Sequence, residues 1–445
     1  MSLDSLFNPR SVALIGASHS EEKLGGAILK NLLRFKGKVY PVNPRYPELM
    51  GIKSYATVTD IPEAVDLSII IRPAEEVPGI IRQLKGKTSS VIIESAGFAE
   101  IGKVDLQKEV KVLGGEYGLR ILGPNCMGLL NPYRRLDTFF LSQERLRRPG
   151  KGNIAVISQS GAILSCLVGE IASIKRGISI AVGYGNAMDI NESDILEYLL
   201  HERKTEVVIT YIEGLTDGRL FVEKAKELSK RKSLLILKAG KGKGGQAAAF
   251  SHTGRLAGRY EVFHSILRQF QIREVSDLDE LMDAAKALSF QRPVQGNRVC
   301  IITNGGGSGV LAADECMRQG LDLPQLSEEI REKIRPQFPE YYGINNPLDL
   351  TAQVKDDDYI TALRLLKDDF DAFILIALPN VFGITADLGK KLGEAKRVLG
   401  KPVVAYIASS KITDKIRRSL ERYGIPVYPS PERAVKGLKA LLISL

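Results

Sequence analysis

The chain has 445 residues, of which 44% are hydrophobic and 26% charged, close to the averages of soluble globular proteins. This length predicts two or three domains and excludes both a single small module and a largely disordered chain. No run of 18 or more apolar residues occurs, and no basic region followed by an apolar stretch opens the sequence, so we expect neither a membrane span nor a secretory signal. The four cysteines are widely spaced without a CxxC pair, which predicts a cytoplasmic protein with no disulfide framework and no metal site of its own.

The net charge of +10 favours an anionic partner. Nucleic-acid binders concentrate Lys and Arg on one element and interleave aromatic residues, whereas here the basic residues are scattered and Trp is absent. We therefore expect small phosphorylated ligands rather than DNA or RNA.

Apolar runs of strand length recur along the chain, each followed by a stretch with helical periodicity, and this alternation predicts parallel βα layers. The runs fall into three groups: 11–16, 38–43, 66–71, 90–95 and 119–123; then 153–158, 178–183, 207–214, 233–240 and 271–275; then 298–303, 371–378, 402–408 and 425–428. Linker-like segments at 145–153 and 292–297 separate the groups. The sequence thus predicts an α/β protein of three doubly wound, Rossmann-like or flavodoxin-like domains with mainly parallel sheets, at 1–145, 150–291 and 297–445.

The second and third domains open alike, with SQSGAILSC (158–166) and TNGGGSGVLAAD (303–314) after an apolar strand. Small polar residues at a strand-to-helix turn leave backbone N–H groups at a positive helix end, which is a ready anion site. The alternative is an ordinary tight turn that needs Gly and Ser for backbone reasons. The first strand ends in Gly16-Ala17-Ser18, short of a dinucleotide fingerprint, and no GxxxxGK[ST] motif occurs, so NAD and P-loop nucleotide sites are disfavoured.

Among the four histidines, His252 is distinctive because it lies in AAAFSHTGRLAG, a loop of small and hydroxylic residues without apolar periodicity. Glu213 stands at the end of an apolar strand, where doubly wound domains carry functional residues. If Glu213 accepts a hydrogen bond from His252 Nδ1, the free Nε2 can attack an electrophile such as phosphorus. An exposed loop histidine without any role is the alternative, and the helical patterns around His201 and His264 favour packing or solvated positions.

Several motifs together resemble one known family, the α subunits of ADP-forming acetyl-CoA synthetase, which are relatives of succinyl-CoA synthetase. The motifs, in chain order over nearly the whole sequence, are ESAGF (94–98), GPNCMG (123–128), SQSG (158–161), Gly185-Asn186, YIEG with Glu213, SHTG with His252, and TNGGGSG (303–309). The resemblance implies the reaction acetyl-CoA + ADP + phosphate ⇌ acetate + ATP + CoA, through acetyl phosphate and a phosphohistidine.

The resemblance also implies roles for individual residues. His252 would take the phosphoryl group, and Glu213 would orient and stabilise it. Phosphate would bind at Ser160, Gly161, Asn304, Gly305, Gly306, Gly307, Ser308 and Gly309. CoA would bind at Gly16, Ala17, Ser18, Lys23, Asn43, Pro44, Pro73 and Glu94. The acyl pocket would comprise Gly123, Pro124, Asn125 and Cys126, with Cys126 lining it rather than acting as a nucleophile.

The family holds ADP or ATP and Mg²⁺ mainly on an ATP-grasp domain, for which this chain has no room beside three α/β domains. The resemblance therefore implies a separate β subunit, an α2β2 heterotetramer and a small-molecule acid as substrate, with neither nucleic acid nor membrane as partner. Met127 stands where succinyl-type relatives commonly carry Pro, so the acid stays open between acetyl, branched-chain, aryl and succinyl groups. A non-catalytic CoA-binding regulatory protein and an NAD-dependent oxidoreductase are the alternatives from other classes.

Overall fold

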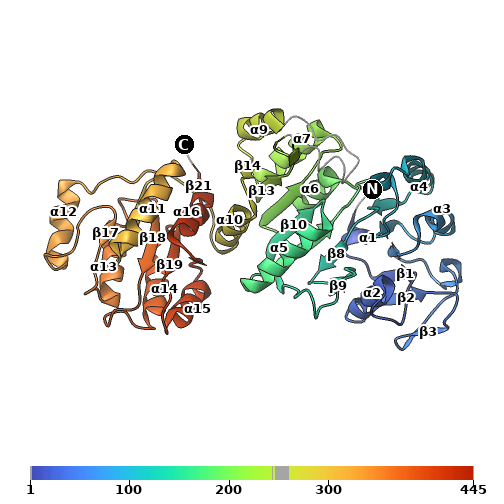
Figure 1. Ribbon diagram of the computed structural model, residues 1–445, viewed down its shortest axis with the longest axis horizontal. Coiled ribbons are helices and arrows are strands. Elements are labelled where there is room, and N and C mark those ends of the chain that lie inside the picture. The colour runs from blue at the N-terminus through green and yellow to red at the C-terminus, as the bar shows by residue number, and fades with distance from the viewer. Residues whose placement is uncertain (1–2, 243, 246–259, 444–445) are drawn as a thin grey trace. The chain divides into compact units, whose positions relative to one another are not determined.

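The computed structural model describes residues 3–242, 244, 245 and 260–443 and divides the chain between Ser276 and Asp277 into two compact units. Figure 1 labels the helices and strands of both. Each unit is built of mainly parallel sheets with helices between the strands, so the predicted α/β class is confirmed. No helix in the described ranges is long and apolar enough to cross a membrane.

The first sheet of unit 1 has the order β2-β1-β5-β6-β7, and all its strands are parallel. This is the flavodoxin-like order, in which the direction of winding reverses between the first and third strands. The strands are β1 (Ser11–Ile15), β2 (Lys38–Val42), β5 (Leu67–Ile70), β6 (Ser90–Ile93) and β7 (Arg120–Leu122), with a hairpin of β3 (Glu48–Leu49) and β4 (Ile52–Lys53). The helices are α1 (Asp4–Phe7), α2 (Leu24–Leu32), α3 (Val77–Gln83) and α4 (Val104–Glu116).

The second sheet of unit 1 has the order β14-β13-β12-β10-β11-β8-β9. Its five parallel strands repeat the order of the first sheet, and β8 and β9 extend one edge in antiparallel pairing. The strands are β8 (Gly128–Asn131), β9 (Leu136–Asp137), β10 (Lys151–Ser158), β11 (Ile178–Gly183), β12 (Val207–Ile212), β13 (Ser233–Lys238) and β14 (Arg273–Val275). The described helices are α5 (Gly161–Ser173), α6 (Glu192–His201), α7 (Gly218–Ser229) and α9 (Tyr260–Gln269).

The two sheets of unit 1 share one apolar core. Leu14 and Leu122 of the first sheet and Ile157 and Val182 of the second belong to the same cluster of buried side chains. The strands β8 and β9 strengthen this connection, because residues expected in the first domain pair with the second sheet. The basic segment 145–153 is not the free linker that its composition indicates, since Arg148 is buried in an ion pair and β10 already begins at Lys151.

Unit 2 carries the third sheet, with the order β17-β16-β18-β19-β20 and only parallel pairs. The strands of this sheet are β16 (Val299–Thr303), β17 (Leu348–Asp349), β18 (Ala372–Ala377), β19 (Val403–Ile407) and β20 (Val427–Tyr428). The strands β15 (Val294–Gln295) and β21 (Leu442–Ile443) pair with each other in a separate two-stranded sheet of unit 2. Its helices are α10 (Leu278–Phe290), α11 (Gly306–Arg318), α12 (Glu328–Ile334), α13 (Asp356–Leu366), α14 (Leu388–Leu399), α15 (Thr413–Arg422) and α16 (Pro431–Ala440). Helix α10, which the sequence assigns to the second domain, packs against α16.

Candidate active site

The first predicted ligand turn follows β1, at the point where the first sheet reverses its winding. Gly16 has φ +94°, and a Cβ there would lie 2.3 Å from the carbonyl oxygen of Ile71, so this position requires glycine. Asn43, after β2, donates a hydrogen bond from Nδ2 to the Ala17 oxygen at 2.8 Å. The structure thus brings Gly16, Ala17 and Asn43 together.

The other expected CoA residues lie beyond the carboxyl ends of strands of the first sheet. Ser18 and Lys23 follow β1, Pro44 follows β2, Pro73 follows β5 and Glu94 follows β6. Ser18 accepts a hydrogen bond from Ser20 N through its hydroxyl oxygen, at 3.2 Å. Lys23, Pro44 and Pro73 are exposed, and Lys23 directly precedes α2. In an open α/β sheet, ligands bind outside the carboxyl ends of the strands. The exposed residues at this edge of the first sheet therefore lie where a ligand of such a fold binds.

The expected acyl loop, Gly123–Cys126, is held from two sides. Asn125 N donates to the Ser95 oxygen at 2.9 Å, just beyond β6. From the second sheet, Asn186 N donates to the Pro124 oxygen at 2.9 Å and Met188 N to the Gly123 oxygen at 3.0 Å. The loop that follows β11 therefore fixes the acyl loop that follows β7.

Gly185 provides a direct test of this contact. It has φ +53°, and a Cβ there would lie 2.2 Å from the Asn125 oxygen and 2.4 Å from the Pro124 oxygen. Because backbone atoms would have to move, we expect Gly185→Ala to lower the free energy of unfolding by about 2 kcal/mol. Urea unfolding followed by circular dichroism measures this. The matched control is Gly79→Ala in α3, where a Cβ meets nothing within 4 Å and stability should not fall; equal midpoints for the two variants would contradict the assigned contact.

Glu94 lies immediately after β6 and is 7% exposed. Neither of its carboxyl oxygens has a hydrogen-bond partner that meets geometric criteria within the part of the chain that the structure describes. Gly128 approaches it so closely that a Cβ there would lie 2.5 Å from Glu94 Oε1 and 2.2 Å from Thr138 Oγ1. Burial raises the pKa of Glu94 well above its ordinary value, and the Thr138 hydroxyl opposes that rise.

Cys126 is buried beside Glu94, and its Sγ donates to the Ile93 oxygen at 3.4 Å. Burial and, to a smaller extent, the nearby Glu94 raise the pKa of the Cys126 thiol well above its ordinary value. A nucleophilic cysteine needs a lowered pKa, so the structure favours the expected lining role.

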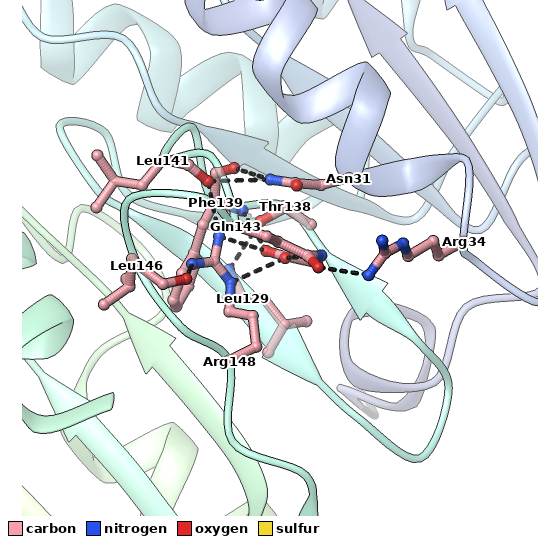
Figure 2. A network of polar contacts seen from close by, with 10 residues as sticks. Asn31, Arg34, Leu129, Thr138, Phe139, Leu141, Gln143, Leu146 and Arg148 are labelled. Carbon is pink, nitrogen blue, oxygen red and sulfur yellow. Dashed lines mark hydrogen bonds and ion pairs between the residues drawn. The ribbon is translucent and has the colours of Figure 1, made fainter. Parts of the chain in front are cut away.

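Thr138, which lies beside Glu94, belongs to a polar network on the segment around β9. Figure 2 shows this network. Asp137 pairs with Arg148, whose Nε donates to Asp137 Oδ2 at 2.9 Å. Arg148 also donates to the backbone oxygens of Leu141 and Leu146, both at 2.7 Å. Gln143 and the amide of Phe139 supply further donors to Asp137, and Asn31 of α2 donates to the Phe139 and Leu141 oxygens. The segment after β9 is thereby fixed to β9 and to α2.

The predicted phosphate turn of the second sheet lies where β10 and β12 end. Ser160 is the N-cap of α5, and its hydroxyl accepts a hydrogen bond from Ile163 N. A methyl group at Gly161 would lie 3.4 Å from Met127 Cβ, so the start of α5 adjoins the residue that follows the acyl loop. The start of the predicted phosphate turn therefore lies next to the motif that contains the predicted acyl loop.

Glu213 stands beside this turn at the end of β12 and is 7% exposed. Gln159 Oε1 accepts hydrogen bonds from Glu213 N at 2.8 Å and Gly214 N at 3.0 Å, and the buried Lys238 donates to the Glu213 backbone oxygen at 2.7 Å. Burial and, secondarily, Glu213 raise the pKa of Tyr211 to about 12. Sequence reasoning did not assign a role to Gln159, although it lies within the SQSG motif. His252 lies outside the described residues, so its distance from Glu213 stays a prediction.

In unit 2 the turn after β16 repeats this arrangement. Asn304 accepts from Leu378 N at 2.8 Å through Oδ1 and donates to the Leu378 oxygen at 3.2 Å, joining the ends of β16 and β18. Gly305 is the N-cap of α11, and a Cβ there would lie 2.7 Å from Leu378 Cδ2. Gly306 and Gly307 are exposed, while Ser308 and Gly309 complete the first turn. The backbone N–H groups of this helix start are thus accessible to an anion. No group of three or more His, Cys, Asp or Glu suited to a metal ion occurs among the residues that the structure describes.

Three family models match successive parts of the chain. Family models match a CoA binding domain at 10–132, a succinyl-CoA ligase like flavodoxin domain at 151–288 and a Ligase-CoA domain at 299–441. The α subunit of ADP-forming acetate–CoA ligase II of Pyrococcus furiosus is 38% identical over 99% of this chain and 97% of its own length. This chain belongs to the ADP-forming acetate–CoA ligase family.

Other members of the ADP-forming acetate–CoA ligase family extend the match. The ADP-forming acetate–CoA ligase of Methanocaldococcus jannaschii is 37% identical over 97% of this chain, which covers 62% of that protein. The structure of a dinucleotide-forming acetyl-coenzyme A synthetase 1 of Ca. Korarchaeum cryptofilum, in complex with phosphate and ADP, is 34% identical with a TM-score of 0.91 and covers 99% of this chain and 96% of that one. The resemblance drawn from the motifs is confirmed.

Proposed function

We propose that this chain is the α subunit of an ADP-forming acetyl-CoA synthetase, which converts acetyl-CoA, ADP and phosphate into acetate, ATP and CoA. One observation carries the proposal: in unit 1, Met127 of the acyl motif lies against Gly161 at the start of α5. A thioester held at the acyl loop would then meet a phosphate held by backbone N–H groups at a positive helix end. Hydrogen bonds to residues that follow neighbouring strands also fix the acyl loop and the residue before Ser160.

The first step joins phosphate to the acyl group. A phosphate oxygen attacks the carbonyl carbon of acetyl-CoA, the carbon–sulfur bond breaks, and acetyl phosphate and CoA form. In unit 1, backbone N–H groups at Ser160 and Gly161 would bind phosphate. In unit 2, the backbone N–H groups from Gly305 to Gly309, with Asn304 behind them, would bind phosphate as well. The CoA would lie along Gly16, Ala17, Ser18, Lys23, Asn43, Pro44, Pro73 and Glu94, with the acyl group at Gly123–Cys126.

The second step moves the phosphoryl group to His252. Its Nε2 attacks phosphorus and acetate leaves, while Glu213 accepts a hydrogen bond from Nδ1–H and stabilises the positive charge of the ring. Hydrogen bonds with Gln159 and Lys238 hold the backbone of Glu213. They support this role because they fix the position from which its side chain extends.

The final transfer to ADP requires a partner in this proposal. An ATP-grasp β subunit would hold ADP and Mg²⁺, in an α2β2 heterotetramer in the cytoplasm. The support is that a relative is named as an α subunit. The chain also spans only 62% of another relative, so the longer protein has residues to spare for such a domain.

The proposal is tested by incubating the chain with acetyl-CoA, Mg²⁺ and labelled phosphate, with and without a nucleotide-binding subunit. Base-stable, acid-labile label on His252 is the expected result. CoA binding without any label, even with the subunit present, would instead identify a binding module. Repeating the assay with propionyl, branched-chain, aryl and succinyl thioesters determines the acid.

Glu213→Gln is expected to lower turnover about 100-fold, because glutamine keeps the shape but removes the charge that stabilises the imidazolium. Steady-state ATP formation measures this. The matched control is Glu223→Gln on the exposed face of α7, which should stay within threefold of the wild type. A Glu213→Gln enzyme as active as that control would remove Glu213 from the mechanism.

A further inference from the structure

Glu94 is a buried ionisable group for which the reaction above has no chemical use beyond contact with CoA. Buried carboxyl groups in folded proteins are almost always paired with a cation or hydrogen-bonded, because an unpaired charge in a low-dielectric site is costly. Glu94 is 7% exposed, and among the described residues no donor meets either of its oxygens with hydrogen-bond geometry. A side chain left in this state needs an explanation.

The surroundings of Glu94 are built rather than accidental. Gly128, with φ +82°, gives it room that any Cβ would fill, and the Asp137–Arg148 pair fixes the neighbouring Thr138. The Thr138 hydroxyl accepts a hydrogen bond from Leu129 N at 2.8 Å and keeps its proton for Glu94, whose pKa it lowers against the larger effect of burial. The site thus preserves a carboxyl group beside the acyl loop without supplying a cation to it.

The groups that face Glu94 leave it as the one suited to proton transfer. Cys126, from the acyl loop, is a thiol whose pKa is itself raised by burial. Asp137, from β9, accepts hydrogen bonds from Arg148, Gln143 and the Phe139 amide, so its oxygens are engaged. Burial raises the pKa of Glu94 far above its ordinary value, which favours the neutral acid.

We infer that Glu94 is the proton donor to the CoA sulfur when the thioester is cleaved and the base that takes the thiol proton in reverse; this rests on the proposed function. As the phosphate oxygen bonds to the carbonyl carbon, the electron pair of the breaking carbon–sulfur bond goes to sulfur, and the Glu94 proton follows it. CoA leaves as the thiol, and Glu94 becomes a carboxylate. The proton that phosphate loses on acylation restores the acid through solvent, so atoms and charge balance.

The inference predicts a specific defect for Glu94→Gln, which keeps the shape and cannot donate a proton to sulfur. In the complex with its nucleotide-binding subunit, acetyl-CoA-dependent labelling of His252 by phosphate should fall about 100-fold. Labelling of His252 from ATP and affinity for CoA should stay within threefold. The matched control is Glu315→Gln, an equally buried glutamate of unit 2 paired with Arg318, for which all three readouts should stay near wild type.

The pH dependence of the wild-type enzyme supplies a second readout, which does not depend on the variant being folded. Because the protonated form is the donor, the wild-type rate of phosphate-dependent acetyl-CoA cleavage should fall as pH rises through the Glu94 pKa, and Glu94→Gln should lose that limb. A variant with wild-type cleavage, a variant that loses CoA affinity in step with turnover, or a wild-type profile without a falling limb would each overturn the inference. If wild-type His252 takes no label from either side, the proposed function itself fails.

Discussion

His252→Ala is expected to reduce ATP formation from acetyl-CoA, ADP and phosphate at least about 1,000-fold. The imidazole is the covalent acceptor in the proposed mechanism, and alanine offers no substitute for it. Binding of CoA should be unchanged, because the expected CoA residues follow strands β1, β2, β5 and β6 rather than the segment that carries His252. Coupled measurement of ATP and direct titration with CoA check the two halves of this result.

The control for His252→Ala is His201→Ala, at the exposed end of α6, which should retain activity within threefold. The loss at His252 should also differ in kind from the loss at Glu94. His252→Ala can still form acetyl phosphate, which the incorporation of labelled phosphate into acetyl phosphate detects, whereas Glu94→Gln is slowed in that earlier step. ATP formation by His252→Ala above a hundredth of the wild-type rate would rule out the phosphohistidine.

The main strands could be predicted because they are buried on both faces and read as continuous apolar runs. The predicted run 178–183 coincides with β11, and the run 11–16 exceeds β1 by one residue. Two-residue strands such as β17 carry too short a pattern to detect. The pair β8 and β9 was missed for a different reason: GLLN follows directly on the acyl motif, and its pairing with β11 depends on a partner about 50 residues further along the chain.

The residues of the candidate site could be predicted where their function depends on one short sequence motif. They could not be predicted where it depends on contacts between distant parts of the chain. The residue types of Gly16 and Ser160 indicate tight turns, and in the structure both residues follow the end of a strand. Thr138 and Gln159 have no comparable signal, because their importance comes from contacts with Gly128 and Glu213 across the fold. The acyl motif reads as a loop, and only the structure shows that its last glycine creates space for a buried carboxyl group.

The five parallel strands of each large sheet have the same order, and this repetition explains why the predicted ligand residues of each sheet lie at the carboxyl ends of its strands. In each sheet the chain reverses its winding beside the first strand, so the turn after that strand opens outward. Gln159 and Asn304 occupy equivalent positions one residue beyond that strand. The side-chain amide oxygen of each accepts a hydrogen bond from the residue that follows the adjacent strand in the sheet, β12 or β18. A single backbone solution thus appears twice, once in each predicted phosphate turn.

Arg148→Ala is expected to lower the free energy of unfolding of unit 1 by about 3–5 kcal/mol, because it leaves the Asp137 charge buried without its cation. The side chains of Arg148 and Asp137 are only 9% and 6% exposed, and Arg148 also satisfies the Leu141 and Leu146 oxygens. The chain has no Trp, so urea unfolding is best followed by circular dichroism together with hydrogen exchange of the β8 and β9 amides.

The matched control for Arg148→Ala is its exposed neighbour, Arg147→Ala, which should change stability by less than about 0.5 kcal/mol. Removing both charges with Asp137→Asn and Arg148→Met should recover part of the loss, since no unpaired charge then remains buried. Because the pair fixes Thr138 beside Glu94, Arg148→Ala should also slow acetyl-CoA cleavage more than labelling of His252 from ATP. Equal stability of the Arg147 and Arg148 variants would mean that segment 145–153 is the loose linker its composition indicates, and that the Glu94 site is held by other contacts.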